Sequence, residues 1–249
     1  MKVKIKLVFL GNIPHLLNVQ KINKWDSELF EIIKVDYINI VGDSDGDEWE
    51  FRDENIISQL PNRGDADILV AVTNVPIQNN YFARLFTDNR GCITYHNMTE
   101  ILKDENIPLE NLLLRVLYSV SFVYRRFGNR VPLYNENAHY THDETRGCIF
   151  DMNGVKTDVI YSMNKPQLCN SCIDALTNNP IGPNRIDRIL INKVQSELKK
   201  IKKDHYYQIT DLIKKHPIWA IIISSFTAII LGIIGSIIGA IIYEKFKNH

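Results

Sequence analysis

The chain has 249 residues, enough for one domain of ordinary size and additional segments. Its 29 lysines and arginines balance 29 aspartates and glutamates, so it lacks the positive charge typical of nucleic-acid-binding domains, and we expect no nucleic-acid partner. Four cysteines are too few for a disulfide scaffold in a chain of this length.

Strand-like and helix-like segments alternate in the N-terminal part of the chain. Runs rich in Ile and Val predict strands at 2–10, 31–41, 67–73 and 91–95. Helical spacing of apolar residues predicts helices at 15–30, 56–60 and 109–127, the last placed between a proline and a glycine. This alternation predicts an α/β (α+β) domain with a mostly parallel sheet, over residues 1–177.

A hairpin is expected after the last of these helices. Residues 147–151 and 155–162 flank Asn153-Gly154, a dipeptide that strongly favours a two-residue turn between two strands. Cys148 lies at the start of this hairpin, and the sequence LCNSCI follows just beyond its end.

A metal site is the first interpretation of the cysteines. Cys169 and Cys172 form a Cys-x2-Cys turn, which directs both sulfur atoms at one ion, and the hairpin brings Cys148 back as a third ligand. Structural zinc takes four cysteine or histidine ligands, so we expect a zinc cofactor in a cysteine knuckle. The fourth ligand is expected to be His142, with His139 and Asp143 as the alternatives.

Two other interpretations of the Cys-x2-Cys motif stay open. The three cysteines can be independent of one another, with the motif only capping a helix. The motif can also serve thioredoxin-like redox chemistry, but it then normally begins a helix directly after a strand of a βαβ unit. The expected hairpin does not provide that context.

The spacing of these residues resembles that of the archaemetzincin family of zinc peptidases. In that family the motif HExxHxxGxxH runs directly into Cys-x4-Cys, and Cys-x2-Cys follows further along. Here His142 is followed by Asp143, four further residues and Cys148, and Cys169 and Cys172 come after a slightly longer gap. The segments EWEFRDENIISQL and DILVAVTNVPI add to the resemblance, which covers roughly residues 2–176.

The catalytic motif of that family is missing. Aligned back from His142, it falls on PLYNENAHYTH, where Pro132 replaces the first ligand and Leu133 the general base. If the helix over 109–127 carries the site instead, it offers the segment RVLYSVSFVYRRF, which contains no histidine or glutamate. A hydrolytic zinc needs three ligands, an open position and a base. We therefore expect no peptidase activity; the alternative is a zinc metallopeptidase that uses Glu136, His139 and His142.

The segment after the domain predicts a linker and a stalk. Residues 178–183 (NNPIGP) predict the linker, and residues 184–216 a long polar helix. An approximate heptad stripe indicates a coiled coil between two or more copies, and a single solvated helix is the alternative because His205 and Gln208 interrupt the stripe. The stripe consists of Ile191, Val194, Leu198, Ile201 and Leu212.

Residues 218–243 carry no charge and exceed the ~20 apolar residues that cross a bilayer as a helix. They predict one transmembrane helix, with a short tail at 244–249 and the lipid bilayer as partner. Lysines are more numerous before the span than after it, which predicts a single-pass membrane protein with its N-terminal domain in the cytoplasm. Small residues every four positions, with Gly235 and Gly239, predict a homo-oligomer through stalk and span.

These observations predict a membrane-anchored cytoplasmic zinc-binding domain that acts as a non-catalytic sensing or effector module. The first alternative is the membrane-tethered metallopeptidase described above. The second alternative is an oligomerising effector whose clustered spans perturb the membrane when the domain is triggered, which the small-residue face of the span favours.

Overall fold

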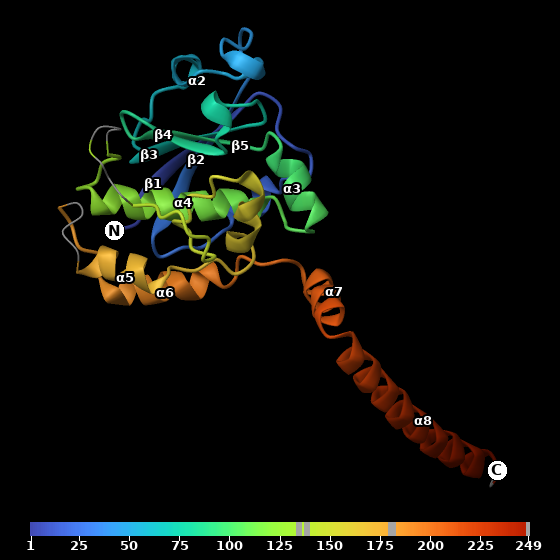
Figure 1. Ribbon diagram of the computed structural model, residues 1–249. Helices are drawn as coiled ribbons and strands as arrows, with labels where there is room; N and C mark the ends of the chain where they lie inside the picture. Colours follow the sequence, from blue (N-terminus) through green and yellow to red (C-terminus); the bar gives the residue numbers. More distant parts are fainter. Residues whose placement is uncertain (133–135, 137–139, 179–182, 248–249) are drawn as a thin grey trace. The chain divides into compact units, whose positions relative to one another are not determined.

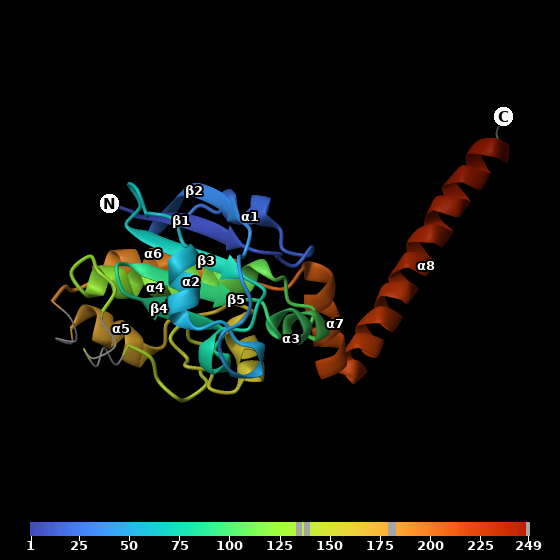
Figure 2. The same cartoon turned by 90° about the horizontal axis from the view of Figure 1, so that it is seen from above.

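The computed structural model describes residues 1–132, 136, 140–178 and 183–247. The chain divides into two units, Met1–Lys203 and Asp204–His249, and each is described by itself. The first unit contains a five-stranded sheet with the order β2-β1-β3-β5-β4, which Figures 1 and 2 show from two directions. The strands are β1 (Val3–Leu10), β2 (Phe30–Ile38), β3 (Ile68–Thr73), β4 (Ala83–Phe86) and β5 (Arg90–Thr94).

All neighbouring strands of the sheet are parallel except β4, which pairs antiparallel with β5 at one edge. The predicted α/β domain with a mostly parallel sheet is therefore confirmed. The predicted strands at 2–10, 31–41, 67–73 and 91–95 correspond to β1, β2, β3 and β5. The short edge strand β4 has no counterpart in the sequence prediction.

Both faces of the sheet are buried, which explains the uninterrupted apolar sequences of β3 and of the second half of β1. Alternate residues of these strands enter two core clusters, as the two-residue period of a strand requires. The larger cluster packs against α4 (Glu110–Arg126), and the smaller packs against α2 (Asp53–Gln59). Figure 1 shows these two helices on opposite faces of the sheet.

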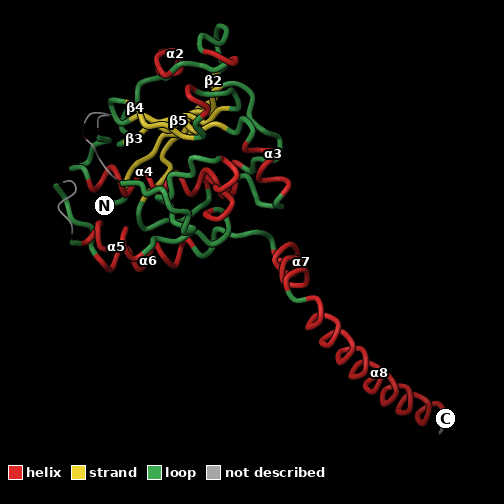
Figure 3. The backbone as a smooth tube through the Cα atoms, in the orientation of Figure 1, coloured by secondary structure: helices red, strands yellow, loops and turns green. Residues whose placement is uncertain are grey.

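Short elements complete this part of the unit. They are α1 (Val19–Asn23), η1 (Asp47–Trp49), η2 (Gln78–Asn80), α3 (Met98–Asp104), η4 (Lys156–Ser162) and α5 (Asn170–Thr177). The helix predicted at 15–30 is thus reduced to the five residues of α1. Between α4 and α5 the described chain consists of loops and one short helix, as Figure 3 shows.

The predicted hairpin around Asn153-Gly154 is wrong. The turn is present, with Asn153 at a φ of 52°, but residues 156–162 form the 3-10 helix η4 and no second strand. Asn153 is buried, and its side-chain amide donates to the backbone oxygen of Asp151. Asn153 thus has the left-handed conformation that the turn dipeptide favours, but the chain continues into η4 instead of a second strand.

The predicted continuous stalk over 184–216 is also wrong. The segment forms α6 (Arg188–Leu198) and α7 (His205–Lys215), separated by a non-helical stretch. Four of the five stripe residues, all but Leu212, are buried in the core of the first unit. The apolar stripe of α6 therefore covers this core, and the first compact unit extends to Lys203 instead of ending at residue 177.

The second unit contains α7 and α8 (Pro217–Lys247). Among the described residues, α8 is the helix that is long and apolar enough to cross a membrane, over Pro217–Ala240. Its large apolar side chains are exposed in the isolated chain. His216 joins the two helices in a non-helical conformation, with φ −133° and ψ 62°.

Candidate metal centre

Four predicted ligands converge where the loop after α4 meets the start of α5. One ligand atom from each of His142, Cys148, Cys169 and Cys172 lies within 4.8 Å of every other. The Sγ atoms of Cys148 and Cys172 are 3.7 Å apart, and Sγ of Cys169 is 3.6 Å from Nε2 of His142. The structure thus brings together the three cysteines and the favoured histidine.

Short stretches of backbone pairing hold these residues in place. The bridge between His142 and Asp151 includes a hydrogen bond from the backbone N–H of His142 to the oxygen of Phe150. A second bridge joins Cys148 to Gln167, directly before the Cys-x2-Cys motif. These two bridges, and not a hairpin, bring Cys148 close to the other ligands.

The start of α5 supplies the other two sulfurs. Cys169 is the N-cap residue of α5, and Cys172 lies in its first turn. The backbone N–H of Cys169 points at Sγ of Cys148, with N and S 3.5 Å apart. A thiolate is stabilised at this position by the unpaired N–H groups and the positive end of the helix dipole.

Gly147 makes the tight turn before Cys148 possible. Its φ is +71°, a value that non-glycine residues adopt only with strain. A Cβ at this position would lie 3.0 Å from the backbone oxygen of Tyr161. Both the conformation and the close packing therefore require glycine here.

The distances fit tetrahedral zinc. Zn–S bonds of about 2.3 Å at the tetrahedral angle place two sulfurs about 3.8 Å apart, and a Zn–N bond of about 2.0 Å places nitrogen and sulfur about 3.5 Å apart. The separations between Cys148 and Cys172, and between Cys169 and His142, are 3.7 and 3.6 Å. Three thiolates and one imidazole are also a typical donor set for structural zinc.

The ring of His142 is oriented for coordination. Its Nδ1 lies 2.9 Å from the backbone oxygen of Glu144, a contact that assigns the ring proton to Nδ1 and leaves Nε2 to face the sulfurs. Burial lowers the pKa of His142, but the hydrogen bond to Cys148 and the nearby thiolates outweigh it, and the net change is upward.

The cysteines of the cluster differ from the fourth cysteine of the chain. Hydrogen bonding from Cys172 lowers the pKa of Cys148, and the same interaction raises the pKa of Cys172. The pair thus favours a thiolate on Cys148 that accepts a hydrogen bond from the thiol of Cys172. Cys92 lies buried in β5 outside the cluster, and burial raises the pKa of its thiol to about 12. Only the cluster has the electrostatic character of a metal site.

Asp151 is a feature of the site that the sequence analysis missed. Its Oδ2 accepts hydrogen bonds from the backbone N–H groups of Arg146 and Cys148, at 3.0 and 2.9 Å, and so shapes the turn that carries Cys148. Its Oδ1 is buried without a hydrogen-bond donor among the described residues, 3.5 Å from Nε2 of His142. A buried carboxylate oxygen in this position favours a nearby cation.

Two guanidinium groups flank the cluster. Arg146 lies on the solvent side, with Nη1 3.7 Å from Sγ of Cys169 and Nη2 paired with Glu144. Arg115 comes from α4, is only 3% exposed, and donates from Nη2 to the backbone oxygen of Asp151 at 2.7 Å. Burial lowers its pKa to about 10, against the attraction of Asp151 and Cys148, so it remains a cation at neutral pH.

Arg115 therefore places a buried positive charge behind a cluster that carries excess negative charge when three thiolates hold a divalent ion. An arginine inside the apolar stretch LLLRVL of α4 is the signal that would have identified it.

The other residues considered as ligands lie elsewhere or outside the described part. Asp143 is exposed and does not belong to the cluster. The carboxylate of Glu136 forms two hydrogen bonds with the guanidinium of Arg130, at 2.6 and 2.8 Å. His139 lies outside the described residues. His142 is committed to the cysteines, so the described residues do not assemble the ligand set of the peptidase alternative.

A largely apolar cavity of about 390 Å³ adjoins the metal loop. It lies between β4 and α4, and Phe150 and Asp151 are shared with the loop. On its side, α4 presents Arg115 and Ser119 together with three valines. None of these side chains is a zinc ligand, and the described residues contain no second group of metal-binding side chains.

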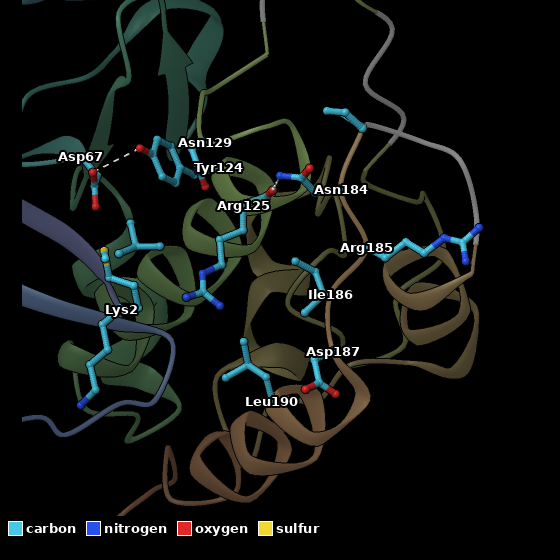
Figure 4. A pocket seen from close by; sticks show the side chains of 13 residues that line it. Lys2, Asp67, Tyr124, Arg125, Asn129, Asn184, Arg185, Ile186, Asp187 and Leu190 are labelled. Atoms are coloured by element: carbon cyan, nitrogen blue, oxygen red, sulfur yellow. Dashed lines mark hydrogen bonds between the residues drawn. The ribbon is translucent and has the colours of Figure 1, made fainter.

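A second cavity, of about 560 Å³, lies beside the end of α4 and the start of α6 (Figure 4). Tyr124 donates to Asp67 there, and Asn184 donates to the backbone oxygen of Arg125. The acids of this cavity, Asp67 and Asp187, each accept a hydrogen bond from a backbone N–H. Its acidic groups therefore serve to hold the backbone.

Comparison with solved structures finds similarity to the crystal structure of archaemetzincin from Methanopyrus kandleri. The sequence identity is 16% and the TM-score 0.42, over 69% of this chain and 91% of that chain. No protein-family model and no curated protein matches the sequence. The role of each residue in the cluster therefore rests on the distances and contacts described above.

Proposed function

We propose that this protein is a non-catalytic metal-binding module anchored to a membrane. Its single zinc ion is held by His142, Cys148, Cys169 and Cys172. The observation that carries the proposal is the convergence of four ligand atoms within 4.8 Å of one another, with the Cys148–Cys172 and Cys169–His142 separations at values that suit tetrahedral zinc.

The composition of the cluster supports a structural role for the ion. Catalytic zinc keeps one coordination position for water or substrate, and four protein ligands leave none. Three thiolates also reduce the Lewis acidity of the ion. The face of α4 beside the neighbouring cavity offers no base and no second ligand set among the described residues.

An ion at this position would link two segments of the chain and stabilise this part of the fold. His142 and Cys148 belong to the long loop after α4, while Cys169 and Cys172 begin α5. The ion would connect these segments in a region with little regular secondary structure (Figure 3). Because its binding free energy contributes to folding, occupancy would decide whether the loop and α5 are ordered. A sensing or effector role would follow from this change.

The second unit supports membrane attachment. The apolar stretch Pro217–Ala240 is about 36 Å long as a helix, which exceeds the hydrocarbon thickness of a bilayer. Trp219 and Tyr243 lie near its two ends, where aromatic residues favour the membrane interface. The lysines before the span would keep the metal-binding unit in the cytoplasm.

Metal content tests the proposal. Residues 1–203 are purified and measured by elemental mass spectrometry, as wild type and with Cys169→Ser, His142→Ala or Cys92→Ser. The proposal predicts one zinc per chain in the wild type and in Cys92→Ser, the control for loss of a thiol outside the cluster. It predicts loss of zinc and of thermal stability in Cys169→Ser.

Absence of metal from the wild type would refute the proposal. A second zinc that survives Cys169→Ser would instead point to a catalytic site. For the membrane part, the full chain should float with lipid vesicles in a density gradient, while residues 1–203 should not.

A further inference from the structure

Helix α7 has one apolar and one polar face. Tyr206, Ile209, Leu212 and Ile213 follow helical spacing and occupy one arc of the helix, and all four are exposed. The opposite arc carries Tyr207, Gln208, Asp211, Lys214 and Lys215. An eleven-residue helix with this separation is not stable in water by propensity alone, so its apolar face needs a partner.

The place of α7 in the chain limits what that partner can be. Only His216 separates α7 from α8, and Pro217 is the first residue of α8. When α8 crosses a bilayer, the C-terminal end of α7 therefore lies at the level of the lipid headgroups. His216 is non-helical, so α7 does not simply extend the span.

The charge around α7 matches an anionic lipid surface. Between residues 199 and 216 the sequence contains six lysines against two aspartates, and five of these lysines remain when Lys203, which is buried and paired with Glu105, is left out. Lys214 and Lys215 lie on the polar face and directly before the span. Basic residues next to a transmembrane helix are attracted to anionic lipids of the cytoplasmic leaflet.

We propose that α7 is an interfacial helix that lies in the headgroup region of an anionic membrane. Its four apolar side chains enter the acyl boundary, and its lysines contact the phosphate and carboxylate groups of the lipids. The inference rests on the proposed membrane span of α8. It assigns α7 a surface role in place of the coiled-coil contact that the sequence stripe predicts, because the α6 part of that stripe is buried within the first unit.

Photo-crosslinking in the full chain tests the orientation of α7. Benzoylphenylalanine is placed at Ile209 or Ile213 on the apolar face, and at the adjacent positions Gln208 or Lys214 on the polar face. Each adjacent pair lies at nearly the same distance along the chain from the span. The protein is reconstituted into vesicles of phosphatidylcholine with about one third phosphatidylserine, and lipid adducts are quantified by mass spectrometry.

The inference predicts several-fold more lipid adduct from Ile209 and Ile213 than from their neighbours, and a smaller difference in vesicles of phosphatidylcholine alone. Equal lipid labelling from both faces would overturn it. Adducts from Ile209 and Ile213 to the first unit or to a second copy would overturn it as well, and would identify the protein surface that covers α7.

Vesicle flotation separates this inference from the proposed function. A chain that does not float refutes the membrane span, and the interfacial helix with it, but leaves the metal content of residues 1–203 unaffected. A chain that floats without facial preference refutes only the inference about α7.

Discussion

Replacing Leu198 by alanine tests whether α6 is part of the folded core. The side chain of Leu198 is 0% exposed and lies in the core cluster that includes α4. Removal of a buried leucine side chain costs the lost transfer free energy together with a cavity contribution, about 3 kcal/mol in all. In a unit of about 200 residues, a loss of this size lowers the melting temperature by about 6–12 °C.

The assay is thermal and urea denaturation of residues 1–203, followed by circular dichroism. Ile189→Ala is the matched control, because Ile189 lies on the same helix and is 66% exposed. It should change the free energy of unfolding by less than about 0.5 kcal/mol. Equal effects of the two substitutions would refute the assignment of α6 to the core. A concentration-dependent loss of stability in Leu198→Ala would revive the coiled-coil stalk.

Three further changes test the contacts around the metal loop and α6. Asp151→Asn should weaken zinc affinity by about 10- to 100-fold, measured by competition with a chelator, because it removes the charge that faces His142. Gly147→Ala should lower the free energy of unfolding by about 1–2 kcal/mol in urea titrations, because of its φ of +71°. Tyr118→Phe should cost about 1–3 kcal/mol in the same assay, because Glu197 and Trp25 each lose a hydrogen bond to its hydroxyl; an unchanged midpoint would contradict this.

Secondary structure was predictable where one local signal dominates. Strand β3 and the second half of β1 are continuous apolar runs, and α4 lies between a proline and a glycine. The ligand set was predictable because the Cys-x2-Cys spacing restricts the geometry of two sulfurs, while a third cysteine and a histidine lie nearby in the sequence. In these cases residues close in sequence determine the result.

The misassigned elements depend on contacts between distant residues. The stripe of Ile191, Val194 and Leu198 has the same spacing whether it faces another chain or the core of its own domain. Its actual partner is α4, with which Glu197 also makes a buried hydrogen bond through Tyr118 at 2.6 Å. Asp151 escaped notice for a similar reason, since it supports the cluster through backbone N–H groups without belonging to the ligand set.

X-ray absorption spectroscopy of zinc bound to residues 1–203 tests the central claim most directly. The account predicts a four-coordinate ion with three sulfurs at about 2.3 Å and one nitrogen at about 2.0 Å. In His142→Ala the scattering from the imidazole should disappear, while the three sulfurs remain. A first shell dominated by oxygen and nitrogen, or one with fewer than three sulfurs, would contradict the assignment of the ion to the cysteine cluster.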